Sequence, residues 1–190
     1  MRSLSPDAIN TLAIRRYEGE VRIVETHQEV ERAMADFAQE RVVGFDTETR
    51  PAFRPGQSYP PALAQVATAR AVYLFPLLRA SFAEPLSALL SSQTIKAGVG
   101  LDDDLRQLRK GFAFTPAAMV DLGAVARSRG MEKSGVRVLA ASFLGFRVPK
   151  GTKTSNWALA RLSPQQIAYA ATDAWVCREL YLALERERWV

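Results

Sequence analysis

The chain has 190 residues, of which 48% are hydrophobic and 24% charged, as expected for a single globular domain that buries a sizeable core. Lys and Arg outnumber Asp and Glu by 25 to 20, so the formal charge is +5, which suits a polyanionic partner or simple solubility equally well. The single cysteine, Cys177, excludes an internal disulfide, and its apolar neighbours predict a buried thiol.

The first residues carry no recognisable targeting segment. Met1 to Asn10 lacks a long apolar stretch, so we expect no signal peptide, and without a run of about 18 apolar residues we expect no membrane span. These features lead us to expect a cytoplasmic protein. Residues 1–20 are polar and mixed, and we expect a partly disordered or extended lead-in, followed by one domain over residues 21–190.

The domain begins with a predicted strand and a capped helix. Val21 to Val24 is short and β-branched, which indicates a strand. Thr26-His27-Gln28-Glu29 is a capping box that predicts a helix running to about Gln39. His27 is the only histidine and has no cysteine nearby, so we expect no zinc site and no Ser-His-Asp triad.

Two acids end an apolar strand that is rich in β-branched residues. Val42 to Thr47 begins with β-branched and apolar residues, which predicts a buried parallel strand. Side chains alternate along a strand, so Asp46 and Glu48 point to the same face and repel each other unless a cation neutralises them. Mg²⁺ or Mn²⁺ with oxygen ligands is the natural occupant, although one solvated acid and one turn cap would give the same pattern.

A proline-rich loop and a hairpin follow. Arg50 to Pro61 contains four prolines and one glycine, which predicts a loop at the border of the acids. Ala62 to Thr68 and Ala71 to Phe75 predict a hairpin that turns at Ala69-Arg70. The next predicted elements are a helix and a strand, at Phe82 to Leu90 and Thr94 to Val99.

The segment from Gly98 to Leu108 changes from strand to helix and carries three acids in its first turn. Acids there suit the positive end of the helix dipole, which explains all three without any function. The apolar stripe of this helix consists of Leu101, Leu105 and Leu108. Asp104 lies on or beside that stripe, whereas Asp102 and Asp103 lie on the polar side. A buried acid without a partner is costly, so Asp104 is the functional candidate.

Beyond this helix the pattern is a short strand followed by two helices. Met119-Val120 predicts the strand, and Asp121 caps a helix that runs to about Arg129. The second helix, from Val136 to Leu144, ends at Gly145.

A basic loop with one large aromatic residue comes next. Its cationic and polar residues can bind a phosphate backbone, and its indole can stack on a base. Because Trp is usually well buried, a solvated loop whose Trp is plugged into the core explains the pattern equally well. The candidate nucleic-acid contacts are Lys150, Lys153, Asn156 and Trp157.

The last predicted helix has a capping box formed by Ser163 and Gln166, and it runs to about Arg188. Its inward stripe contains Tyr169, Asp173, Val176, Leu180 and Leu184. Tyr169 and Asp173 therefore lie one turn apart on the side that faces the core. Such a pair is most often structural, but here it completes a set of acids.

The Asp-x-Glu pair, the inward Asp104 and the Tyr-x-x-x-Asp pair follow one another along the chain in a characteristic order. This order resembles that of the DEDDy branch of the 3′–5′ exonuclease superfamily, ribonuclease-H-like enzymes that include ribonuclease D and Werner-type exonuclease domains. The resemblance covers residues 21–188 and rests on Val43-Gly44-Phe45-Asp46-x-Glu48, Lys96-Ala97-Gly98-Val99-Gly100-x-x-x-Asp104, Ser155-Asn156-Trp157 and Tyr169-Ala170-Ala171-Thr172-Asp173-Ala174. Gly100 stands where the second motif often has Asn, as it does in Werner-like members. Loop 50–61 has no strong counterpart, and the DEDDh branch would have a histidine near Asp173.

The resemblance implies an α/β fold, a ribonuclease-H-like mixed β-sheet flanked by helices in a single domain. It implies that two divalent cations, Mg²⁺ or Mn²⁺, are held by four acids, which are Asp46, Glu48, Asp104 and Asp173. Tyr169 would orient the attacking water, since a phenol with an unshifted pKa of about 10 is a poor base at neutral pH.

The implied activity is hydrolysis of phosphodiester bonds from a free 3′ end, with release of nucleoside 5′-monophosphates and with DNA favoured as the nucleic-acid partner. One alternative is RNA 3′-end trimming or cleavage of short oligoribonucleotides, because reading the 2′-OH depends on local contacts. The other alternative is a domain that binds nucleic acid without cutting it. Such a domain is expected to have lost an acid, and all four are present. The residues indicate no particular oligomeric state.

Overall fold

Strand β2 (Val42–Thr49) is one of the two central strands of the sheet and carries Asp46 and Glu48 near its end. The computed structural model describes residues 4–54, 56–78, 82–149 and 155–190. Six strands form one mixed sheet in the order β1-β4-β3-β2-β5-β6. β2 pairs antiparallel with β3 (Pro61–Ala67) and parallel with β5 (Ile95–Gly98), so the parallel strand predicted here has an antiparallel neighbour on its other side.

The outer strands complete the sheet. β4 (Ala71–Pro76) pairs antiparallel with β3, which confirms the predicted hairpin, and parallel with β1 (Glu20–Ile23). β6 (Met119–Asp121) pairs parallel with β5. Every residue of β3 and β4 is buried, because helices cover both faces of the sheet here.

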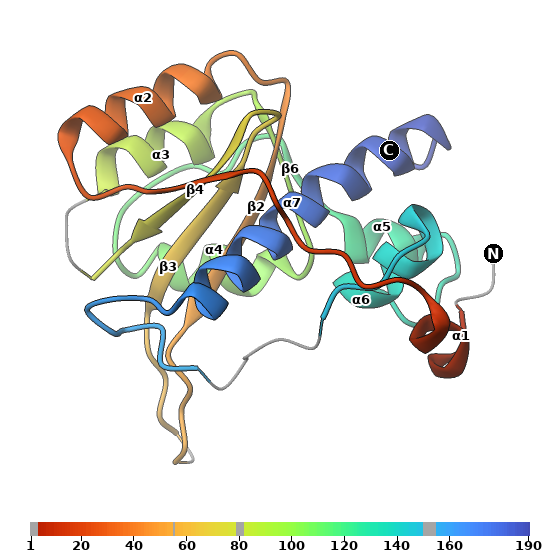
Figure 1. The fold of residues 1–190 in the computed structure, drawn as a ribbon. Helices are drawn as coiled ribbons and strands as arrows, with labels where there is room; N and C mark the ends of the chain where they lie inside the picture. Colours follow the sequence, from red (N-terminus) through yellow and green to blue (C-terminus); the bar gives the residue numbers. More distant parts are fainter. Residues whose placement is uncertain (1–3, 55, 79–81, 150–154) are drawn as a thin grey trace.

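The helices lie on two sides of the sheet (Figure 1). α2 (His27–Phe37), α3 (Ala83–Ser91) and α4 (Leu101–Leu108) pack over one face, where their apolar side chains join Val43 and Phe45 in the core. α7 (Pro164–Arg186) crosses the opposite face. Two shorter helices pack against α7 on that side, α5 (Leu122–Ser128) and α6 (Val136–Leu139).

Helix α7 lies antiparallel along β2 in close contact. A Cβ atom on Gly44 would lie 1.9 Å from the carbonyl oxygen of Ala174, so only glycine permits this approach. At the beginning of the strand, the Arg41 guanidinium donates hydrogen bonds of 2.7 and 2.6 Å to the Glu185 carboxylate near the end of α7. The helix is therefore fixed against the strand along its length.

The predicted helix starts agree with the structure. The capping boxes of Thr26 with Glu29 and of Ser163 with Gln166 are both present. Asp121 accepts a hydrogen bond of 2.9 Å from the backbone N–H of Ala124, as predicted for a cap. The helix predicted from Val136 to Leu144 is α-helical only in its first four residues, and a π-helical turn (Ala140–Leu144) follows before it ends at Gly145.

The lead-in differs from the expectation in part. Residues 6–11 form helix α1 (Pro6–Thr11), whose N-cap Ser5 accepts a hydrogen bond from Ala8. Ser, Pro and Asp at the start of a helix are the usual start signals, and they explain this helix. The extended residues that follow pair with Arg147 and so join the domain. Among the described residues, no helix combines the length and the apolar character that crossing a membrane requires.

Candidate active site

Three carboxylates meet where β2 ends beneath α7. Asp46, Glu48 and Asp173 each offer an oxygen, and these oxygens lie within 4.8 Å of one another. The strand supplies the first two on one face because side chains alternate, and α7 supplies the third. Three of the four predicted acids are thus brought together by two elements that pack directly on each other.

Mutual repulsion and loss of water make this group of acids unfavourable on its own. Burial, and then the charges of Asp173, Asp104 and Glu48, raise the pKa of Asp46 well above its usual range. A divalent cation would relieve that repulsion, and all three groups offer the oxygen ligands that Mg²⁺ and Mn²⁺ prefer. The residues present therefore fit a site for a hard divalent cation.

Tyr169 lies one helical turn before Asp173, as its spacing predicted, and its hydroxyl is hydrogen-bonded to that carboxylate. Burial, followed by the nearby Asp173 charge, raises the pKa of Tyr169. The phenol therefore stays protonated at neutral pH. It can donate and orient, but it cannot act as a base.

Asp104 has a different environment from the other three acids. Its carboxylate accepts a hydrogen bond of 2.5 Å from the Thr47 hydroxyl, and it is not one of the three acids that meet beneath α7. Burial raises the pKa of Asp104 to about 6, although the hydrogen bond from Thr47 lowers it. Asp102 and Asp103 are exposed, and Asp103 pairs with Arg106, so the predicted helical register is confirmed.

The start of α4 is fixed by an acid from another strand end. Asp121 accepts backbone hydrogen bonds of 3.1 Å from Gly100 and 3.2 Å from Leu101, in addition to capping α5. Gly100 has a φ of 82°, a left-handed conformation that favours glycine. The turn that places Asp104 therefore favours glycine at this motif position.

A cavity of about 420 Å³ lies over the acids and includes several residues that the sequence interpretation missed. Its lining residues are Asp46, Thr47, Glu48, Thr49, Val99, Gly135, Val136, Tyr169, Asp173 and Cys177. Cys177 follows Asp173 by four residues, so the helical stripe could have placed it there. Its thiol is buried, as predicted, and burial raises its pKa. No sequence pattern predicts that Gly135 and Val136 line the cavity, because only the folding of the chain brings them there.

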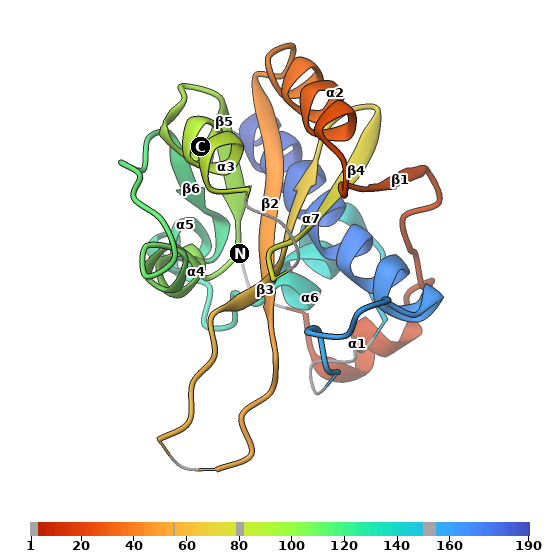
Figure 2. The ribbon, with the colours of Figure 1, turned by 90° about the vertical axis from the view of Figure 1, so that its left-hand side faces the viewer.

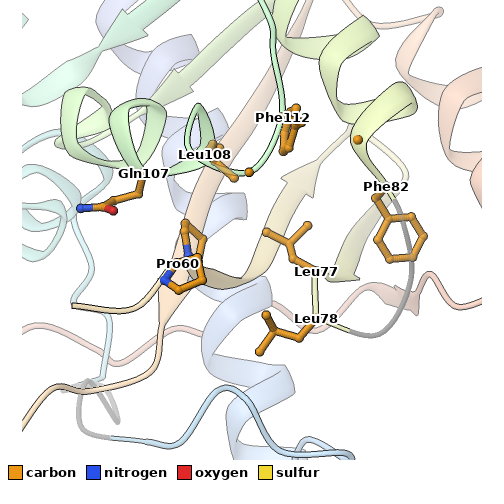
Figure 3. A pocket seen from close by; sticks show the side chains of 10 residues that line it. Pro60, Leu77, Leu78, Phe82, Gln107, Leu108 and Phe112 are labelled. Atoms are coloured by element: carbon orange, nitrogen blue, oxygen red, sulfur yellow. The ribbon is translucent and has the colours of Figure 1, made fainter. Parts of the chain in front are cut away.

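A second cavity of about 260 Å³ lies between the start of β3, the start of α3 and the end of α4 (Figure 3). Its lining residues are Pro60, Pro61, Leu77, Leu78, Phe82, Ala83, Gln107, Leu108, Gly111 and Phe112. None of these side chains is charged, so this cavity offers no carboxylate to neutralise a cation. The carboxylates that fit a divalent cation line the first cavity.

The predicted nucleic-acid contacts are only partly described. Lys150 and Lys153 lie outside the described residues. Asn156 is exposed, and its side chain accepts a hydrogen bond of 3.1 Å from the backbone of Ala158. Trp157 is 2% exposed, and its ring centroid lies 6.0 Å from that of Tyr169. The structure thus matches the alternative in which Trp157 is plugged into the core, where it supports Tyr169.

The fold and the site together define a class of protein. A six-stranded mixed sheet flanked by helices, with acids on its central strand and further acids from two helices, is the ribonuclease-H-like exonuclease fold. The sequence pattern of the 3′-5′ exonuclease family matches residues 21–189. The chain belongs to this family, whose members are phosphodiester hydrolases, and the resemblance inferred from the motifs is confirmed.

Known proteins with similar sequences and structures agree. The chain is 33% identical over 150 residues to the bifunctional 3′-5′ exonuclease/ATP-dependent helicase WRN of Mus musculus, covering 75% of this chain and 11% of that protein. It is 30% identical to ribonuclease D of Gluconacetobacter diazotrophicus, covering 86% of this chain and 42% of the relative. The Aedes aegypti Nibbler EXO domain has a TM-score of 0.78 at 23% identity, covering 92% of this chain and 91% of that one. The chain spans at most about half the length of these two sequence relatives.

Proposed function

We propose that this chain is a two-metal 3′–5′ exonuclease that removes nucleoside 5′-monophosphates from the 3′ end of a nucleic acid. The observation that carries the proposal is the meeting of Asp46, Glu48 and Asp173 within 4.8 Å, in a chain of the 3′-5′ exonuclease family. Two divalent cations suit in-line phosphodiester cleavage, because one activates the attacking water and the other stabilises the leaving oxygen.

Each residue has a role that its environment supports. Asp46, Glu48 and Asp173 would hold the cation nearest the attacking water, and Asp46 would also face the second cation. Asp104 accepts a hydrogen bond from the Thr47 hydroxyl and would support the second cation through water. Tyr169 remains protonated and hydrogen-bonded to Asp173, so it would orient the water or the scissile phosphate.

DNA is the favoured substrate in this proposal, and RNA is the alternative. The relatives point both ways, since one is named an exonuclease joined to a helicase and another a ribonuclease. The formal charge of +5 suits either polyanion. The presence of all four acids argues against the remaining alternative, a domain that only binds.

The test is an activity assay on matched DNA and RNA oligonucleotides of one sequence, single- and double-stranded, with Mg²⁺ or Mn²⁺. The expected products are nucleoside 5′-monophosphates released stepwise from a labelled strand, with faster release from DNA. Asp46→Ala is the matched inactive control. Faster release from RNA would favour the trimming alternative. Binding without metal-dependent release, or unchanged release in Asp46→Ala, would contradict the proposal.

A further inference from the structure

A long connection between β2 and β3 leaves the body of the molecule at the active site. Residues 50–60, which we name the arm, follow directly after Thr49, and Thr49 lines the acid-lined cavity. Thr49 pairs with Pro61, so the root of the arm is closed by the sheet. Figure 1 and Figure 2 both show the arm projecting beyond the end of the sheet.

The arm has a defined conformation at its root and its tip. The Arg50 guanidinium lies over the Tyr59 ring, 4.6 Å from its centroid, and this contact joins the two limbs. At the tip, the backbone N–H of Gln57 donates a hydrogen bond of 3.1 Å to the carbonyl of Arg54, and Gly56 has a φ of 78°. The described residues of the arm thus form a turn on two limbs, and most of them are exposed.

The chemistry of the arm is cationic and aromatic. It contains Arg50 and Arg54 and no acidic residue, and Phe53 beside Arg54 is 81% exposed. A single exposed aromatic residue is ordinary. An exposed aromatic ring between two arginines, beside an active site for nucleic acids, is the combination that binds single strands, because arginine pairs with phosphate and the ring stacks on a base.

We propose that the arm is a second contact for the nucleic acid and binds the strand several nucleotides away from the 3′ end. This inference rests on the proposed function, which puts the 3′ end at the three acids. Five extended residues reach about 17 Å from Thr49. A stacked strand rises about 3.4 Å per nucleotide, so the tip lies level with about the fifth nucleotide. The arm then selects substrates by length.

The test compares a double variant, Phe53→Ala with Arg54→Gln, against a control, Arg70→Gln. Arg70 is an exposed arginine in the β3–β4 turn, at the opposite end of the sheet from the arm. Binding of labelled single strands of about 3 and about 12 nucleotides, one shorter and one longer than the reach of the arm, is measured by fluorescence anisotropy. These measurements use the Asp46→Ala background, so that no cleavage occurs. KM and kcat are measured with Asp46 intact.

For the longer strand, the double variant should raise Kd and KM at least about fivefold, the lower end of what loss of one stacked base costs. It should leave kcat unchanged, and the Kd of the shorter strand should stay within about twofold of the parent value. Arg54→Gln alone should reduce the slope of log Kd against log salt by about 0.7, the effect of one phosphate contact on a single strand. The control should match the parent on both strands.

A second variant keeps the test independent of the two side chains. Replacing residues 51–59 by Asn-Gly shortens the arm to a tight turn while β2 and β3 remain paired. A melting temperature close to that of the parent shows that the shortened protein is folded, and the same loss on the longer strand is expected.

Unchanged binding of the longer strand in both variants overturns the inference, as does an equal loss on the shorter strand or in Arg70→Gln. Cleavage of the shorter strand by the parent chain tests the proposed function separately, because that substrate does not reach the arm. A parent chain that binds the longer strand through the arm but cleaves neither strand would overturn the proposed function. It would still support the inference that the arm binds nucleic acid.

Discussion

Helices α7 and α4 each bring a carboxylate to the end of β2, but they hold it in different ways. α7 has 23 residues and lies against the strand through Gly44, so Asp173 joins Asp46 directly. α4 has eight residues, and its acid, Asp104, is held by one hydrogen bond from Thr47. Asp173 also has a hydrogen-bond partner on its own helix, Tyr169 one turn away. A long helix can thus supply both the packing and the partner that hold an acid in a repelling group, whereas the acid of the short helix takes its hydrogen bond from the neighbouring strand.

The largest expected effect comes from breaking the group on the α7 side. Asp46→Ala should abolish nuclease activity and leave the protein folded, because it removes the acid shared by both cation positions. Without metal, the melting temperature of the variant should equal or exceed that of the parent, since repulsion is relieved. Mn²⁺ should raise the melting temperature of the parent alone, and a parent chain that gains nothing from Mn²⁺ would contradict the metal site.

The next effect concerns the α4 side. Asp104→Asn should lower kcat by orders of magnitude, because the amide cannot supply the charge that a second cation requires. Asp102→Asn and Asp103→Asn are the matched controls, and both should be mild because these side chains are exposed. Steady-state kinetics on one oligonucleotide compares the three. Equal losses would mean that Asp104 has no special role.

A smaller effect is expected from Tyr169→Phe, which keeps the ring and removes the hydroxyl bonded to Asp173. If Tyr169 positions the water, kcat should fall more than about tenfold while Kd for the nucleic acid stays unchanged, as for an interaction made mainly in the transition state. The stability gained from Mn²⁺ should persist, because the carboxylates remain. Near-normal turnover would reduce Tyr169 to a structural role.

The smallest effect tests the hydrogen bond that holds Asp104. The folded pKa of Asp104 is about 6 and lies above the unfolded value, so the metal-free folded state binds more protons than the unfolded state. Its stability should therefore rise as pH falls from about 7 to 5. Thr47→Val removes a bond that lowers this pKa, so the rise should begin at a higher pH. Chemical denaturation in EDTA across this range measures the free energy of unfolding of the parent and of Thr47→Val. Identical curves of that free energy against pH would contradict a link between the Thr47 hydrogen bond and the pKa of Asp104.

Most of the arrangement of the acids could be predicted from the sequence, because it follows from the periodicity of strands and helices and from the position of each acid within them. Alternation along the strand placed Asp46 and Glu48 on one face, and the leucine stripe of α4 selected Asp104 among three acids. The Thr47 partner of Asp104 could not be predicted, because that contact depends on how α4 packs against a distant strand. The burial of Trp157 was likewise undetermined, since its loop has no periodicity that would orient the ring.

Strand β2 and helix α7 lie side by side but rise by different lengths per residue. From Arg41 to Asp46 the strand covers about 17 Å at 3.3 Å per residue, and from Glu185 to Asp173 the helix covers about 18 Å at 1.5 Å per residue. The Arg41–Glu185 ion pair aligns the two elements at one end. The number of residues from that pair to Asp46 and to Asp173 therefore determines whether the two acids meet at the other end. Inserting one residue would move an acid by about 3.3 Å and turn it over in the strand, or move it by about 1.5 Å and rotate it by about 100° in the helix. Between the ion pair and the acids, the number of residues in each element matters as much to the site as their identity.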